Sequence, residues 1–261
     1  LDQPIVVQLG RFLGNVAQGD LGEDVFSNRA VADIVLEQLP FTLILVFSAI
    51  GAATLIGVPL GCFSAIRRNS VWDRLTAVLS VAFIAVPSFV VALYALLLLS
   101  VKLRWFPAIG AGEAGNWSDI AYHLVLPTLA LGLGWVGYIA RLVRASMLEV
   151  MEENHIRTAR AFGLPERVVI GRYALRIAIL PTITILGLGL GTMLSGALFA
   201  EIIFSRPGIG KLLHEAVMTR NYPVVMGTVL VTTVFFVAST LLSDIVNALL
   251  DPRLRSQGDR R

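Results

Sequence analysis

Five arginines lie within one short stretch of the sequence, RTARAFGLPERVVIGRYALRIAILP, which covers residues 157–181. Guanidinium groups bind carboxylates and carbonyl oxygens, so the cluster favours contact with an acidic or carbonyl-rich protein surface. Gly163 suits the left-handed position that ends a helix, and Pro165 suits the first turn of the next one. The pattern therefore predicts, within 152–176, a short helix over 155–162, a turn and a second helix.

The first of these helices would be short, polar and exposed. Arg157 and Arg160 would lie on it, with the small residues Thr158, Ala159 and Ala161 between them. Such a helix is small enough on one side to enter a groove and charged enough to be held there. A basic loop that faces water and lipid headgroups is the alternative interpretation.

Other residue types that carry chemistry are sparse. Cys62 is the only cysteine and lies in an apolar run, so a disulfide within the chain is excluded. The chain has no phosphate-binding Gly-Lys-Ser/Thr loop, and we predict no ATP site, no metal site and no catalytic group in it. Asp244 is an acid within the last apolar stretch. An acid inside the membrane is a candidate functional group, and the alternative is a structural hydrogen bond that caps a helix or joins two helices.

The composition places these residues in a membrane protein. Hydrophobic residues make up 56% of the 261 residues and charged ones 15%, and the mean hydropathy is +0.77. Roughly 20 residues of helix cross the hydrocarbon core. Five apolar stretches are long enough, and they predict an all-α, polytopic bundle with spans at about 39–66, 75–101, 120–140, 177–200 and 223–250.

Small residues recur along these spans at the spacing of helix contacts. They include Gly57 with Gly61, Gly187 with Gly191, Gly191 with Ser195, and the cluster at 132, 134 and 137. Such residues let helices approach closely in lipid, either as static packing or as faces that slide. The span over 177–200 would also have a narrow, mildly polar face, so we predict Met193 and Ser195 as residues that line a substrate pathway.

Basic residues set the orientation. Of the 21 Lys and Arg, 14 lie between spans one and two, around the 152–176 loop or in the tail over 251–261. The positive-inside rule therefore places these segments in the cytosol, and it explains the pI near 9.4 without nucleic acid. Residues 1–34, with a short amphipathic helix over 4–18, would lie outside, before a membrane domain at 35–250. Nothing in the chain would carry them across, so we expect a further helix before residue 1.

The 157–181 stretch resembles the cytosolic coupling loop, or EAA loop, of binding-protein-dependent ABC import permeases. Arg157-Thr158-Ala159 stands where Glu-Ala-Ala stands in the consensus, and Gly163 and Leu180-Pro181 also match. The absent Glu and the longer distance to Leu-Pro are typical of the peptide/nickel branch. ARLVRASMLEVMEENHIRTARAFGL (140–164), EIIFSRPGIGKLLHEAVMTRNYPVV (201–225) and ALLDPRLR (248–255) are similar to the B-type permease subunit of that branch.

This resemblance implies one transmembrane subunit of a type I ABC importer for peptides, in the inner membrane. Its partners would be a homologous second permease, two ATPase subunits that bind the ATP and Mg²⁺, and an external substrate-binding protein. The residues that contact the ATPases would be Arg157, Thr158, Ala159, Arg160, Ala161 and Gly163. Nickel chelates, glutathione or another small solute are alternative cargoes. A self-sufficient secondary transporter or channel is the alternative of another class, but the spans lack a relay of buried acids and histidines.

Overall fold

The structure is a computed structural model that describes residues 4–250. Its described part consists of helices joined by loops, and its one strand-like feature is an isolated antiparallel bridge between Glu23 and Ala30, which confirms the all-α prediction. The helices that build the bundle are α2 (Val31–Ile66), α3 (Val71–Ala85), α4 (Ser88–Ala95), η1 (Leu96–Lys102), α5 (Trp117–Met151), α9 (Leu180–Ile203) and α11 (Tyr222–Leu250). The predicted tail at 251–261 lies outside the described residues.

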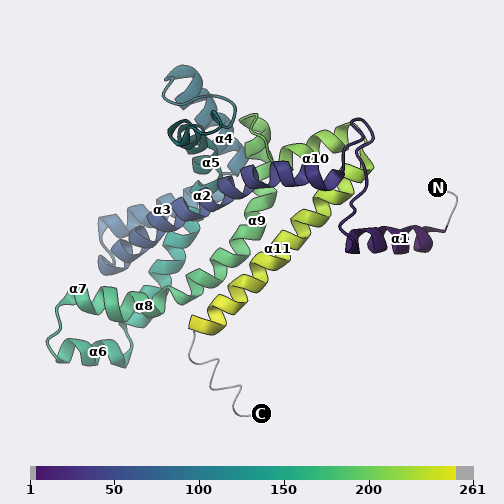
Figure 1. The fold of residues 1–261 in the computed structure, drawn as a ribbon. Coiled ribbons are helices and arrows are strands. Elements are labelled where there is room, and N and C mark those ends of the chain that lie inside the picture. Colours follow the sequence, from purple (N-terminus) through teal and green to yellow (C-terminus); the bar gives the residue numbers. More distant parts are fainter. Residues whose placement is uncertain (1–3, 251–261) are drawn as a thin grey trace, which may run out of the picture.

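Shorter helices lie at the two ends of this bundle (Figure 1). At one end, with the C-terminal end of α11, lie α6 (Asn154–Ala161), α7 (Glu166–Val168), η2 (Val169–Ala174) and α8 (Leu175–Ala178). At the other end lies α10 (Ile209–Met218), while α1 (Ile5–Ala17) extends away from the bundle. The chain thus has an arginine-rich end, which carries α6, and an opposite end, which carries α10.

Four helices in the described part are long and apolar enough to cross a membrane, namely α2, α5, α9 and α11 up to Val246. They correspond to four of the five predicted spans. However, α2 begins at Val31 and not near residue 39, so Pro40 lies inside it, and the predicted domain boundary at residue 35 falls within the helix.

The predicted span over 75–101 is not one straight helix. It is broken after Ala85, and the pair α3 and α4–η1 is bent by 96°. Val86 is extended, with φ −85° and ψ 121°, because the ring of Pro87 disfavours the helical conformation of the residue before it. Pro87 therefore divides this stretch into two arms, and only the pair together has the length of a span.

Helix contacts in the bundle use the small residues that the sequence singled out. A Cβ added to Gly61 of α2 would lie 2.5 Å from the carbonyl oxygen of Ala140 on α5, and one at Gly57 would lie 2.9 Å from Cβ of Ile139. On α9, a Cβ at Gly187 would overlap Ser243 of α11. These glycines thus lie where two helices meet, which accounts for the close approach of α2 to α5 and of α9 to α11.

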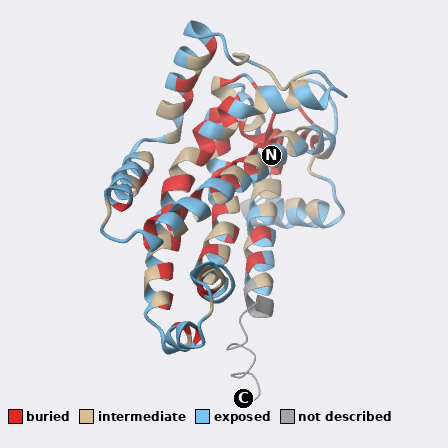
Figure 2. Ribbon diagram, turned by 90° about the vertical axis from the view of Figure 1, so that its left-hand side faces the viewer, coloured by how far each residue is buried: buried red, intermediate tan, exposed pale blue. Residues whose placement is uncertain are grey.

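Buried residues follow the inward faces of the long helices, and their outward faces stay exposed (Figure 2). One hydrophobic cluster joins α2, α4, α5 and α9. A second cluster, which we call the α6 seat, lies at the arginine-rich end; its buried members are Ala53, Ala65, Val136, Ile139, Val143, Met147, Val150, Ile156, Ala159, Val169, Ala174 and Ala178. Asp244 of α11 is exposed and takes no hydrogen bond or ion pair within the described part of the chain.

Candidate functional site

The arginine-rich loop between α5 and α9 contains the predicted helix, turn and second helical segment. Gly163 follows α6 with φ +73°. Its N–H donates to the carbonyl oxygen of Arg160 at 2.9 Å, and the N–H of Leu164 donates to that of Ala159 at 3.4 Å. These two bonds make a Schellman motif, which satisfies carbonyl groups at the end of the helix. The prediction of a left-handed glycine at this helix end is confirmed.

The inner face of α6 holds the helix against its own chain. Ile156 is fully buried and Ala159 is 5% exposed, and both belong to the α6 seat with Met147 of α5 and Ala65 of α2. The sequence analysis placed Ala159 among the residues that contact an ATPase. In the structure, Ala159 lies on the buried face, because positions three apart share one helix face and Ile156 turns this face toward the core.

The outer face of α6 is exposed. Arg157, Thr158 and Ala161 lie on it, as predicted, and Phe162 follows them with 82% of its surface accessible. Sequence reasoning missed Phe162, because it weighed charge and small size and passed over the aromatic ring. Aromatic and Arg side chains are the types most enriched at the centres of protein interfaces. The outer face therefore combines one cation and one aromatic ring on a helix whose other face is fixed.

Arg160 is engaged within the loop. Its Nη2 lies 2.7 Å from Oε1 of Glu166 and its Nε lies 3.3 Å from Oε2, so the guanidinium grips both carboxylate oxygens across the Gly163 turn. This contact lowers the pKa of Glu166 below its ordinary value. Arg157 reaches only the carbonyl oxygen of Glu152, at 3.5 Å. Arg160 thus stabilises the turn, and Arg157 is the arginine of the pair that is free of a carboxylate partner within the described residues.

A cavity of about 550 Å³ opens where the α3–α4 break faces α5 and α9. Its lining carries no Asp, Glu, Lys, Arg or His; the polar side-chain groups there are the hydroxyls of Ser88, Tyr138 and Thr192 and the indole N–H of Trp135. Trp135 is the largest aromatic group in the lining, and it packs into a notch left by Gly189 of α9. The cavity can therefore accommodate apolar side chains and neutral polar groups, but it offers no charged partner to a ligand.

The two predicted pathway residues lie differently with respect to this cavity. Met193 lines it and is 1% exposed. Ser195 is exposed and is not part of the lining, because two residues along a helix turn a side chain by more than half a circle. Thr192 and Gly196 of α9 line the cavity with Met193.

A buried polar cluster at the opposite end of the bundle was also missed. Glu201, near the end of α9, is fully buried, and its carboxylate accepts bonds from Oγ1 of Thr42 at 2.5 Å and from the N–H of Lys211 at 3.0 Å. Thr42 in turn accepts a bond from the N–H of Ile209 at 2.8 Å. The cluster fixes the start of α10 to α2 and α9. The predicted span ended at residue 200, one position before this glutamate.

Comparison with known proteins adds the family. Residues 57–256 match the binding-protein-dependent transport system inner membrane component. The chain belongs to this family. A putative peptide permease protein of Brucella suis biovar 1 is 39% identical over 259 residues, which cover 98% of this chain and 81% of the relative. The glutathione transport system permease protein GsiC of Shigella flexneri serotype 5b is 35% identical over 255 residues, with the same two shares covered.

Solved structures agree on the fold. The MetNI methionine ABC transporter in an inward-facing conformation matches with a TM-score of 0.70 at 16% identity, over 84% of this chain and 96% of that one. An amino acid ABC transporter crystallised with histidines matches with a TM-score of 0.61 at 16% identity, over 90% and 97%. The chain is thus a multi-pass permease of the ABC importer family, and the curated relatives are transport permease subunits, as the sequence predicted.

Proposed function

We propose that this permease carries peptides inward across the cytoplasmic membrane as one of two transmembrane subunits. Two partner ATPases hydrolyse ATP, a homologous permease completes the pathway, and an external binding protein delivers the cargo. Support for the cargo comes from relatives named as peptide permeases, at 39% identity over nearly the whole chain. The uncharged cavity suits a peptide backbone with mixed side chains, because neutral hydroxyls and apolar groups line it.

We assign the ATPase contact to the outer face of α6. It presents Arg157 and Phe162 to the outside, while Ile156 and Ala159 anchor the opposite face. A force that a partner applies to the exposed face of such a helix is passed to the core, because the buried face cannot slide without disturbing the close packing there. In this proposal α6 lies in the cytosol with the C-terminus, and its displacement reaches α5 and α9 through the α6 seat.

Glutathione is the alternative cargo that one observation favours, since a relative at 35% identity is named for it. Glutathione is itself a small peptide, so the two assignments share the backbone chemistry. They differ in the charge and linkage of the cargo, which the external binding protein would select.

Reconstitution of the complete complex in proteoliposomes tests the proposal. We expect uptake of labelled peptide that requires ATP, and competition among a dipeptide, a longer peptide, glutathione and a nickel chelate identifies the cargo class. Uptake driven by a proton gradient without ATP would contradict the proposal and favour a secondary transporter.

Substitutions on α6 test the contact itself. Arg157→Glu combined with Phe162→Ala should weaken retention of the ATPase subunits during purification, because both the cation and the aromatic ring are removed. Arg74→Glu is the matched control, since it makes the same charge change at an exposed site on α3 at the same end of the bundle. Equal ATPase retention in the α6 variant and the control would exclude this face as the contact.

A further inference from the structure

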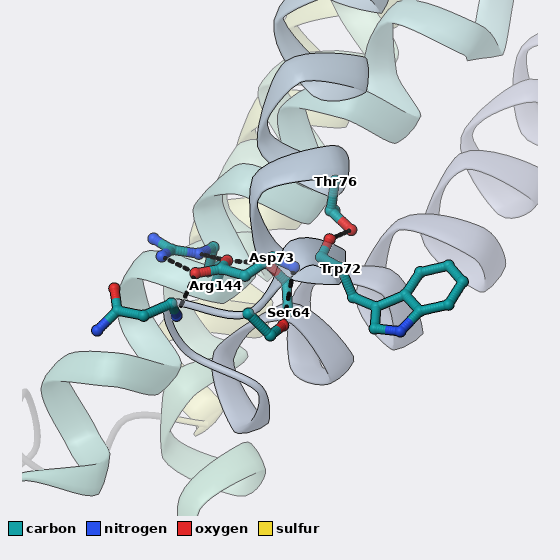
Figure 3. Close-up of polar contacts among 7 residues, drawn as sticks. Ser64, Trp72, Asp73, Thr76 and Arg144 are labelled. Carbon is teal, nitrogen blue, oxygen red and sulfur yellow. Dashed lines mark hydrogen bonds and ion pairs between the residues drawn. The ribbon is translucent and has the colours of Figure 1, made fainter.

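One buried carboxylate joins three helices at the arginine-rich end (Figure 3). Asp73, in the first turn of α3, is 4% exposed. Its Oδ1 accepts bonds from Oγ of Ser64 on α2 at 2.6 Å and from Nε of Arg144 on α5 at 2.5 Å. Its Oδ2 accepts bonds from Nη2 of Arg144 at 2.8 Å and from the N–H of Asn69 in the α2–α3 turn at 2.9 Å.

The geometry makes this a stiff connection. Arg144 grips both oxygens of the carboxylate, and bidentate charge-assisted bonds fix direction as well as distance. The side chain of Asp73 is 5% exposed and that of Arg144 is 30% exposed, so solvent weakens the pair much less than it weakens the open Arg68–Glu152 pair nearby. A rotation of α5 about its axis would therefore move the start of α3 with it.

The connection lies close to α6 along the chain. Arg144 is seven residues before the end of α5, and α6 begins three residues after that end. Met147 of α5 and Ala65 of α2 flank the Arg144–Asp73–Ser64 contact in sequence and belong to the α6 seat with Ile156. The α6 seat therefore joins the buried face of α6 to residues of α5 and α2 that neighbour the contacts of Asp73.

The other end of α3 forms a wall of the 550 Å³ cavity. Ile84 belongs to the last turn of α3, Val86 and Pro87 form the break that follows, and Ser88 begins α4; all four line the cavity. Twelve residues of helix separate Asp73 from Val86, so the single helix α3 has the ion pair at one end and the cavity wall at the other. The 96° bend at this break gives α3 a direction different from that of α4.

We propose that the Asp73–Arg144 ion pair is the joint through which movement of α6 enters α3 and shifts the cavity wall at Val86–Ser88. Asp73 and Arg144 are positioning residues in this mechanism and touch neither ATPase nor cargo. The proposal rests on the proposed function, since it assigns how an ATPase-driven movement of α6 reaches the pathway.

The first test measures coupling in the complete reconstituted complex. Asp73→Asn keeps the size of the side chain and removes its charge. We expect the ATPases to stay bound and to hydrolyse ATP, while peptide uptake per ATP falls about 2- to 30-fold, the range over which substitutions in a coupled network act. Arg141→Gln is the matched control, because Arg141 is an exposed arginine one turn earlier on α5. Unchanged uptake per ATP in Asp73→Asn, or an equal fall in the control, would overturn the proposal.

The second test follows the cavity wall directly. With Cys62→Ala as background, Ser88→Cys supplies a single reporter in the cavity lining. In the complex with native Asp73, its labelling rate should differ between the nucleotide-free and the vanadate-trapped states, and Asp73→Asn should abolish the difference. A difference that persists without the Asp73 charge, or that never occurs, would overturn the joint. Failure of the unsubstituted complex to couple ATP to uptake at all would instead contradict the proposed function.

A third comparison covers the case in which Asp73→Asn fails to fold. Arg144→Lys keeps the charge and one bond to Asp73, whereas Arg144→Gln removes the charge. We expect uptake per ATP in the Lys variant to lie closer to that of the native complex than in the Gln variant, a rescue that a purely space-filling role would not produce. Equal values for the two variants would show that the charge pair is not the joint.

Discussion

Gly163 is the single position in the loop where backbone conformation restricts the residue type. Its φ is +73°, yet an added Cβ would meet no atom within 4 Å. A side chain there would be strained by its own backbone and not by neighbours, at a cost of about 1–2 kcal/mol. Gly171, also in open space but in the helical segment η2, carries no such restriction.

This contrast gives a matched pair of variants. Gly163→Ala should loosen the Schellman motif, so that backbone amides of 159–164 exchange hydrogen roughly 5–30-fold faster. Gly171→Ala should leave that exchange unchanged, because alanine suits a helix better than glycine does. Hydrogen exchange followed by mass spectrometry measures both, and equal exchange in the two variants would show that the turn does not depend on a left-handed residue.

At the scale of helices, the contact between α2 and α5 depends on the absence of side chains. Gly61→Ala would place a methyl group against the carbonyl oxygen of Ala140 and push the helices apart, which costs about 1–3 kcal/mol. Gly51→Ala, in the same helix, meets nothing within 4 Å and should stabilise α2 slightly. Thermal unfolding of the purified protein in detergent should therefore give a lower Tm for Gly61→Ala than for Gly51→Ala. A higher Tm for Gly61→Ala than for Gly51→Ala would show that α2 and α5 do not make close contact at Gly61.

Hydropathy could predict α2, α5, α9 and α11 but not the shape of the α3–η1 stretch. Apolar character is a sum over a window, and it is the same for a straight helix and for two arms at 96°. Pro87 was visible in the sequence, but proline also occurs inside intact helices, as Pro40, Pro59 and Pro127 do here. The break occurs at Pro87 because the two arms, α3 and α4–η1, pack against the neighbouring helices α5 and α9 in their bent arrangement.

At the scale of the whole molecule, α6 and α10 lie at opposite ends of the bundle, which predicts opposite sides of the membrane. In the full-length protein with Cys62→Ala, Phe162→Cys should react with an impermeant maleimide only from the cytosolic side. Ser118→Cys, exposed at the start of α5, should react only from outside. Labelling of both from one side would refute the orientation drawn from the positive-inside rule.

Local properties of the chain were determined by the sequence alone. The apolar character of four spans, the left-handed Gly163 and the exposure of Arg157 follow from residue type and from neighbours close in the chain, and the family resemblance follows from longer stretches of sequence. Tertiary structure decided which partner each polar group takes. Arg160 bonds Glu166, Arg144 bonds Asp73 across 71 positions, and Ala159 turns inward because Ile156 is buried beside it. Such pairings depend on how distant helices pack, and packing is a property of three-dimensional shape that no periodicity in the chain encodes.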